Sequence, residues 1–324
     1  MSPRRRQFLT AILAGSACGL SVPFARAGNG PVIRMLVGFT PGGAVDVVAR
    51  ALAEGMRASG YTVVVENKAG ASGQLANDAL AAAPADGGTL LFSPATNLTL
   101  YPQTAKEPRT HARDFIALGG ACEFDFGIAV AQSCPARTLK DFLALSKRDS
   151  QFAAYGTPGN GTPMHLLGAM LAKTSGVPLT HIPYKGGSAA MTDAIGGAVP
   201  ALITTLPNLV PTHKSGKLRI LASTADKRAP DLADVPTFSE LGFPLLSMTD
   251  YFAVFARTGI APDMEARLSA AVAASAASPG FMATLQQLGY RSNVMGIDVL
   301  RARIAKDRAR WTAIVKSTGY TRDA

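Results

Sequence analysis

Two segments of the sequence share one order of features: an apolar run, a glycine-rich turn and a helix start. The first runs from Val32 to Val37 and continues as FTPGGAVDVVAR, with Asp46 in the first turn of the expected helix. The second is FAAYGTPGNGTPMHLLGAM, where Thr162 occupies the N-cap position and Pro163 the first helical position. Each predicts a strand, a tight turn and a helix whose first backbone N–H groups lack intrahelical partners. Helix N-termini of this kind are sites for anions.

Strand-like and helix-like stretches alternate along most of the chain, which is typical of α/β layers around a largely parallel sheet. Thr138 is expected to cap a helix over 139–148, and Ser72 to cap the helix that follows it. From Pro262 to about Lys316 the apolar periodicity predicts helix throughout. Further strands are expected at Tyr61–Glu66, Thr89–Ser93, Ala201–Thr205 and Leu218–Ser223. The 324 residues are enough for two α/β domains.

Residues 1–27 have the composition of an export signal. They have a basic start, an apolar stretch from Phe8 to Leu20 and the small-residue cleavage pattern ARA ending at Ala27. The run RRQFL fits a twin-arginine signal. The apolar core of roughly 12 residues is shorter than the about 20 that span a bilayer. We expect cleavage near Ala27. Lipid attachment at Cys18 remains an alternative, although Gly15 is a poor residue three positions before it.

The charge distribution argues against nucleic-acid binding, and the cysteine positions bear on a possible disulfide. Loss of the four arginines in residues 1–27 lowers the net charge from +10 to +6, a modest excess that suits an anionic small molecule. The mature chain has no Lys/Arg run with interleaved aromatics, so nucleic acid is not an expected partner. Cys122 and Cys134 remain in the exported chain. If the residues between them form one strand, they lie beyond disulfide reach, and only a bend near Gly127 would join them.

Signatures of catalysis are missing. The stretch GGSA at Gly186–Ala189 lacks the second glycine of a nucleophile elbow. GTPGNGTP has Thr162 where a phosphate-binding P-loop needs lysine, and lacks the third glycine of a dinucleotide fingerprint. No metal-ligand spacing connects the four histidines, His111, His165, His181 and His213. We therefore predict no enzyme, no cofactor and no metal site, but binding of an anion.

Several candidate residues have two interpretations. Asp46 either contacts the ligand or only stabilises the helix dipole. His165 either contacts the ligand or hydrogen-bonds the glycine loop. Lys185, between Tyr184 and Gly186, either presents an amine to a carboxylate or is solvated.

The glycines and the loop after the third expected strand are also ambiguous. Gly42, Gly159 and Gly161 could serve only to allow positive φ. For Gly43 the turn and the anion site are one geometry, so we expect a binding role. Beyond the strand end, hydroxyl and amide groups either reach a cleft or are solvated; these belong to Ser93, Thr96 and Asn97.

Seven segments in order resemble one family. They are PVIRMLVGFTPGGAVDVVAR, VVVENKAGASGQLA, PADGGTLLFSPAT, YGTPGNGTPMHLLGAML, HIPYKGGSAAMTDAIGGAV, GKLRILASTADKRAPDLADVPTFSELGFP and KDRARWTAIVKSTGY. Together they are similar to the tripartite tricarboxylate transporter substrate-binding proteins, also called the Bug receptors of Bordetella and its relatives. The resemblance covers nearly the whole mature chain.

The resemblance implies a periplasmic binding protein of the type II class: two α/β domains joined by crossing strands, closing over one ligand in the cleft between them. Residues 28–125 with 250–324 would form domain 1 and residues 126–249 domain 2. The implied ligand is a small organic anion, a mono- or dicarboxylate, delivered to a membrane permease of the tripartite tricarboxylate type. The protein would be a periplasmic monomer without enzymatic activity. A receptor that docks on a membrane sensor kinase remains the alternative.

The resemblance also carries over site residues. Domain 1 would contribute Gly42, Gly43, Ala44 and Asp46 from the first loop, with Ser93, Thr96 and Asn97. Domain 2 would contribute Thr157, Gly159, Asn160, Gly161 and Thr162, with His165 behind them, and Tyr184, Lys185 and Thr204.

The chain departs from the family pattern at three positions. Thr40 replaces a usual proline, and Tyr251 a frequent tryptophan. Thr204 stands where an acid is usual, which argues against an amino-acid ligand.

Overall fold

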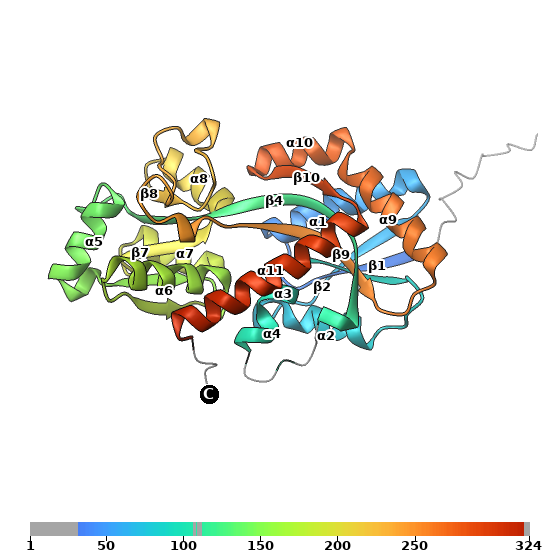
Figure 1. The fold of residues 1–324 in the computed structure, drawn as a ribbon. Helices are drawn as coiled ribbons and strands as arrows, with labels where there is room; N and C mark the ends of the chain where they lie inside the picture. Colours follow the sequence, from blue (N-terminus) through green and yellow to red (C-terminus); the bar gives the residue numbers. More distant parts are fainter. Residues whose placement is uncertain (1–31, 106–107, 109–111, 321–324) are drawn as a thin grey trace, which may run out of the picture.

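The computed structural model describes residues 32–105, 108 and 112–320 (Figure 1). The predicted signal peptide at 1–27, including Cys18, lies outside these residues, as does His111. Within the described ranges no single helix is long and apolar enough to cross a bilayer, and only the helix pair Pro262–Ala276 and Pro279–Leu288, bent by 60°, passes that test jointly.

One group of strands forms what we call the first lobe. β1 (Val32–Val37) pairs in parallel with β2 (Thr62–Asn67) and with β3 (Thr89–Pro94). β9 (Thr249–Arg257) pairs antiparallel with β3 and with β4 (Phe115–Ala131). β10 (Arg291–Met295) pairs antiparallel with β4. The carboxyl ends of β1, β2 and β3 therefore meet at one edge, where α/β proteins hold their ligands.

β4 is 17 residues long and changes partners along its length. Phe115 to Asp125 pairs with β9, whereas Phe126 to Ala131 pairs with β7 (Ala201–Thr205) and β8 (Leu218–Ser223). Parallel pairing adds β5 (Ala154–Thr157) to β7 and β6 (Thr180–Pro183) to β5. We call β5 to β8 with the end of β4 the second lobe. The strand pairing and the helices below confirm the prediction of an α/β fold.

β4 also answers the question of the cysteines. The strand continues through Gly127 to Ala131, so no bend brings Cys134 back to Cys122. Both thiols are free, and Cys122 is buried.

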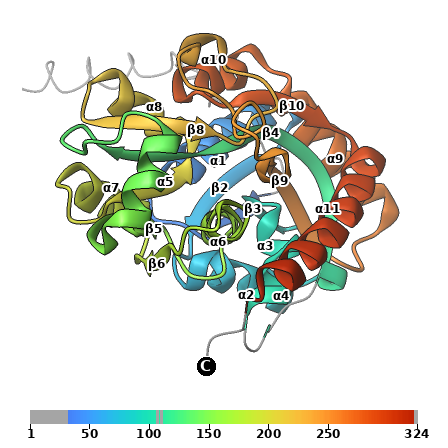
Figure 2. The ribbon, with the colours of Figure 1, turned by 60° about the vertical axis from the view of Figure 1, so that its left-hand side comes forward.

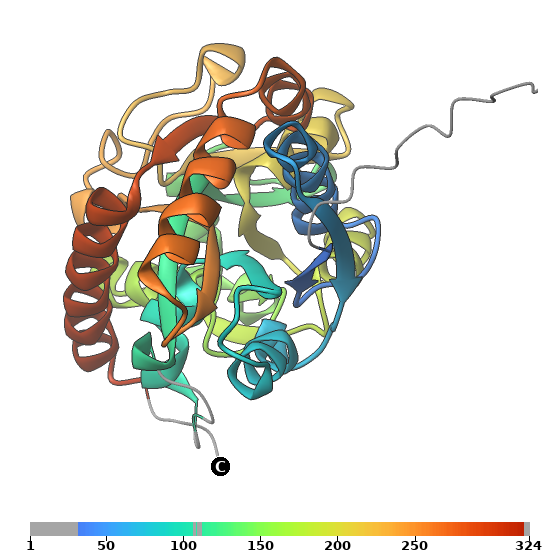
Figure 3. The same ribbon diagram turned by 90° about the vertical axis from the view of Figure 1, so that its right-hand side faces the viewer.

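Helices cover both lobes (Figure 2). The first lobe carries α1 (Ala44–Met56), α2 (Gln74–Ala82), α3 (Thr96–Thr99), α4 (Tyr101–Thr104), α9 (Pro262–Ala276), α10 (Pro279–Leu288) and α11 (Ile297–Thr318). The second lobe carries α5 (Leu139–Arg148), α6 (Pro163–Ser175), α7 (Gly187–Ile195) and α8 (Leu206–Lys214). α9 and α11 both pack against β4 (Figure 3).

Local signals explain where helices begin, with one error. Thr138 caps α5 as predicted, and Asp141 completes a reciprocal capping box with it. Thr162 caps α6, with Pro163 at the first helical position. The prediction that Ser72 caps α2 was wrong: Ser72 has a left-handed φ of 54°, and Gly73 is the N-cap without a side-chain bond.

The helical prediction for the end of the chain was also wrong at one place. α10 ends at Gly289, whose φ is +75°, and β10 follows before α11 begins. The β10 residues Arg291 and Asn293 hydrogen-bond Glu123 of β4. These long-range contacts fix a polar strand that local periodicity could not indicate.

The core of the first lobe is aromatic. The ring centroids of Phe92 and Phe252 lie 5.4 Å apart, those of Phe124 and Phe252 4.7 Å, and those of Phe124 and Tyr290 5.5 Å. Phe92, Phe124 and Phe252 come from β3, β4 and β9, and Tyr290 lies between α10 and β10. The aromatic cluster therefore joins the sheet to the end of α10. Each such pair contributes about 0.5–1.5 kcal/mol beyond its buried area.

Candidate functional site

The first loop is held by bonds within itself. The N–H of Gly42 donates to Asp46 Oδ2 at 2.9 Å, and the N–H of Gly43 donates to Thr40 O at 3.3 Å. Neither glycine therefore offers its N–H to a ligand. The N–H groups of Ala44, Val45 and Asp46 begin α1 and find no acceptor among the described residues. They are the donors that this helix N-terminus presents.

Asp46 has a role that neither sequence interpretation included. Besides Gly42, its carboxylate accepts hydrogen bonds from Arg50 Nε at 2.9 Å and Asn67 Nδ2 at 2.8 Å. Asn67 Nδ2 also donates to Phe39 O at 3.0 Å. Burial alone would raise the pKa of Asp46, but the bonds from Arg50, Gly42 and Asn67 hold its pKa below the usual range. Asp46 thus ties the first loop to the end of β2.

A neighbouring loop, Gly70–Gly73, was missed as a candidate. Its four residues all have positive φ, including Ala71 at 46° and Ser72 at 54°. A left-handed non-glycine residue costs about 1–2 kcal/mol, so this loop stores strain of the kind found at functional sites. A Cβ on Gly73 would lie 2.5 Å from Asn97 Nδ2. The glycines in KAGASG were the available signal.

The polar residues at the carboxyl end of β3 have different roles: Ser93 and Thr96 make contacts within the protein, whereas the Asn97 amide is left for a ligand. Ser93 is buried in β3 opposite Ala253. Thr96 Oγ1 donates to Asp250 Oδ2 at 2.7 Å, so it faces β9. Asn97 Nδ2 is buried and has no acceptor among the described residues. A buried donor left unpaired costs about 1–3 kcal/mol, and a ligand oxygen would satisfy it.

The second loop is also organised from within. Thr157 Oγ1 and Thr162 Oγ1 both donate to Gly159 O, at 3.0 and 2.8 Å. Thr162 Oγ1 in turn accepts the N–H of His165 at 3.3 Å. The N–H of Gly161 donates to His165 Nδ1 at 3.2 Å, which supports the loop-organising interpretation of His165.

His165 is itself positioned by aromatic neighbours. Its ring stacks on that of His181, with centroids 3.7 Å apart and planes at 13°. His181 Nε2 is hydrogen-bonded to Thr157 Oγ1 at 2.7 Å, which connects the stack back to the loop. Tyr320 meets the His165 ring edge-on at 5.4 Å.

The structure brings the second loop against the first lobe. Thr104 Oγ1 of α4 donates to Gly161 O at 3.1 Å. A Cβ on Gly159 would lie 3.1 Å from Ser72 Oγ, so the loop Gly70–Gly73 faces Gly159. Asn160, between the two glycines, is exposed. The glycine-rich loops of the two lobes therefore approach each other.

Three other candidates make their contacts within the second lobe. Tyr184 donates its hydroxyl to Asp193 Oδ2 at 2.9 Å and packs its ring on Gly156. Lys185 is exposed. Thr204 is buried in β7, opposite Gly127 of β4. The contacts of these residues do not connect them to the first loop.

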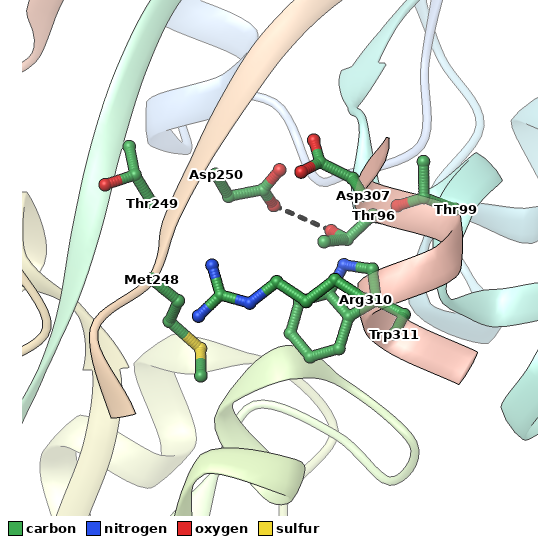
Figure 4. Close-up of a pocket in the computed structure, with 8 residues that line it drawn as sticks. All are labelled: Thr96, Thr99, Met248, Thr249, Asp250, Asp307, Arg310 and Trp311. Carbon is green, nitrogen blue, oxygen red and sulfur yellow. Dashed lines mark hydrogen bonds between the residues drawn. The ribbon is translucent and has the colours of Figure 1, made fainter. Parts of the chain in front are cut away.

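A small cavity of about 10 Å³, room for about one water molecule, lies beside the point where the chain re-enters the first lobe (Figure 4). Its lining comprises Thr96, Thr99, Met248, Thr249, Asp250, Asp307, Arg310 and Trp311. Burial, together with the nearby Asp307, raises the pKa of Asp250 to about 7 against the hydrogen bonds from Thr96 and Tyr251 N–H. Burial also raises the pKa of Asp307. Two carboxyl groups make this cavity unfavourable for an anion.

Nor do the residues that the structure describes contain a group of three or more His, Cys, Asp or Glu side chains that could hold a metal ion. The arrangement of the two loops offers backbone and amide donors instead.

Known proteins are similar to this chain in sequence and fold. The family model for the tripartite tricarboxylate transporter family receptor matches residues 48–320. Protein BugT of Bordetella pertussis is 32% identical over 293 residues, which cover 89% of each chain. The structure of the periplasmic binding protein BugD is similar with a TM-score of 0.82 and 31% identity, covering 90% of this chain and 99% of BugD. R. palustris Rpa4515, solved with adipate, has a TM-score of 0.82 and 27% identity, with coverage of 89% and 97%.

The family model spans most of the described chain, including the loop Gly70–Gly73 and the second loop, whereas the first loop lies before its start at residue 48. The order of the sequence motifs, the strand pairing and these similarities agree. The chain belongs to the tripartite tricarboxylate transporter receptor family and is a Bug-type receptor.

Proposed function

We propose that this receptor binds a small organic anion, a mono- or dicarboxylate, between its two lobes. The observation that carries the proposal is the set of unsatisfied donors at the carboxyl edge of β1 to β3. These are the N–H groups of Ala44, Val45 and Asp46 at the start of α1 and the buried Asn97 Nδ2. Donors without acceptors, at the positive end of a helix of 13 residues, favour a carboxylate.

The second loop supplies the opposite side of the proposed site. α6 is also 13 residues long and begins at this loop, so its positive end adds to that of α1. We assign contacts there to the loop from Thr157 to Thr162. The relative solved with adipate, a dicarboxylate, supports this ligand class.

Binding would close two domains over the ligand. We propose residues 28–125 with 250–324 as one domain and 126–249 as the other, because β4 changes its pairing partners after Asp125 and β9 returns to the first lobe at Thr249. We further propose export to the periplasm with cleavage near Ala27, and delivery of the ligand to a membrane permease.

The test is a thermal-shift screen of residues 28–324 against aliphatic and aromatic carboxylates, amino acids and uncharged vitamins. Ligand at 100 times its dissociation constant adds about 2.7 kcal/mol of stability, a visible shift. A carboxylate that shifts the melting temperature supports the proposal. A shift from uncharged compounds alone would contradict it.

A variant pair then tests the site. Asn97→Asp replaces the unpaired donor by a negative acceptor of the same shape, and should weaken carboxylate binding at least about tenfold, or 1.4 kcal/mol. Asn208→Asp on α8, where the side chain is exposed, is the matched control and should bind like the parent. Equal affinity in both variants would remove Asn97 from the site.

A further inference from the structure

The C-terminal helix connects the two lobes. α11 packs against β4 in the first lobe, and its last turns lie beside α6 of the second lobe (Figure 1). Lys173 of α6 donates its ammonium to the carbonyl of Ser317 near the end of α11. Gly319 then ends α11 in the left-handed conformation, and Tyr320 follows it.

Tyr320 contacts both lobes. Its hydroxyl donates to Thr104 O of α4 at 3.3 Å, which holds it to the first lobe. Its ring lies edge-on against the His165 ring of the second lobe, with centroids 5.4 Å apart and planes at 76°. Because Thr104 and His165 belong to different lobes, a separation of the lobes would break at least one of these two contacts.

The same three residues surround Gly161 of the second loop. Thr104 Oγ1 donates to Gly161 O, and the Gly161 N–H donates to His165 Nδ1. A Cβ on Gly161 would lie 3.0 Å from Thr104 Oγ1 and 3.1 Å from Tyr320 Oη. Gly161 therefore packs directly against Thr104 and Tyr320.

We propose that Tyr320 is a positioning residue for the second loop, holding it against the first lobe and slowing the release of the ligand. Only the part of this inference that concerns ligand release rests on the proposed function. Tyr320 acts through Thr104, Gly161 and His165: its hydroxyl bonds Thr104 of the first lobe, and its ring lies against His165 of the second. Tyr320, which follows the C-terminal helix, thereby contributes to the proposed binding site.

Two variants separate the contributions. Tyr320→Ala removes the ring and the hydroxyl, whereas Tyr320→Phe keeps the edge-on ring contact and removes only the bond to Thr104 O. Lys316→Ala, at an exposed position one turn earlier on α11, is the matched control.

The first readout needs no ligand. Hydrogen–deuterium exchange in the peptide covering residues 156–166 should be several-fold faster in Tyr320→Ala than in the parent, intermediate in Tyr320→Phe and unchanged in Lys316→Ala. Exchange elsewhere and the melting temperature should stay the same. Parental exchange in Tyr320→Ala, or acceleration throughout the protein, would overturn the positioning role.

The second readout uses adipate as the probe, or the strongest carboxylate of the screen. Tyr320→Ala should release it roughly three- to tenfold faster, the factor for losing one edge-to-face ring contact. An unchanged release rate in Tyr320→Ala would overturn the closure role. If no carboxylate binds the parent protein, the proposed function fails, and the exchange experiment still decides whether Tyr320 positions the loop.

Discussion

The carboxylate of Asp46 accepts the N–H of Gly42 across the turn that precedes α1. The first-turn acid of the helix therefore stabilises the glycine turn that starts it, and it occupies a donor that a ligand could otherwise use. In the proposed site, the donors for an anion are therefore the N–H groups of Ala44, Val45 and Asp46 and not those of the glycines.

Asp46→Asn tests this relationship. The neutral amide cannot accept equally from Gly42, Arg50 and Asn67, so we expect a loss of about 1–3 kcal/mol in the free energy of unfolding, with weaker ligand binding. Urea denaturation at pH 7 measures the change. Asp298→Asn is the control, because Asp298 is also a first-turn acid but is exposed. Equal losses in both variants would mean that Asp46 acts only on the helix dipole.

Asp250 should make stability depend on pH in an unusual direction. Burial raises its pKa to about 7, whereas an unfolded aspartate has a pKa of about 3.9. Between these values the native state binds more protons than the unfolded state, so this group's contribution to stability falls as pH rises from about 4 to 7 and is level above.

Asp250→Asn should remove that dependence and gain stability relative to the parent at pH 8, with little difference near pH 4. Thermal melts across this range measure it. Asp307 faces the same cavity and has a raised pKa, so Asp307→Asn should reduce the dependence without abolishing it. A parent and Asp250→Asn with parallel pH profiles would show that Asp250 does not titrate in this window.

Gly161 and Gly176 offer a matched pair, since both have a φ of +66°. An alanine at either position should cost about 1–2 kcal/mol for the left-handed backbone. Only Gly161 has close neighbours, Thr104 and Tyr320, whereas nothing lies within 4 Å of a Cβ on Gly176. Gly161→Ala should therefore lose about 1–3 kcal/mol more and bind carboxylate less tightly. Identical unfolding curves and affinities would argue against the close packing of the second loop.

In protein comprising residues 28–324, the thiols of Cys122 and Cys134 should react very differently. Cys122 is buried in β4, and burial raises its pKa far above the usual thiol range, whereas Cys134 is partly exposed after the strand. A thiol reagent at pH 8 should label one equivalent at Cys134 in the native protein and two only after denaturation. Labelling of Cys122 in the native state would contradict its burial in β4.

Local patterns predicted the parts of the fold that local forces determine. The caps of α5 and α6 follow from Thr138 and Thr162, and the strands Ala201–Thr205 and Leu218–Ser223 were placed at their observed bounds. β10 was missed because its polar residues are held by Glu123, far away in the sequence. Ser72 was misassigned because a serine before a helix usually caps it, whereas here it adopts a left-handed conformation beside the second loop.

The candidate site shows the same division. Glycines and helix starts indicated the two loops. Their proximity depends on β4, which pairs with strands of both lobes. No single segment of the sequence predicts that pairing. The distribution of donors within the first loop depends on which N–H groups Asp46 and Thr40 occupy. That is a property of the folded turn, so the sequence could name the loop but not the donating atoms.

Trp311 is the single tryptophan of the chain, and it lies with Asp250 and Thr96 around the cavity where the chain returns to the first lobe. Indole emission responds to the polarity and charge of its surroundings. The protein thus contains one intrinsic fluorophore at the junction of its two lobes, on the helix α11 that precedes Tyr320. The proposed closure of the lobes can be tested there in unlabelled protein, with no competing tryptophan signal.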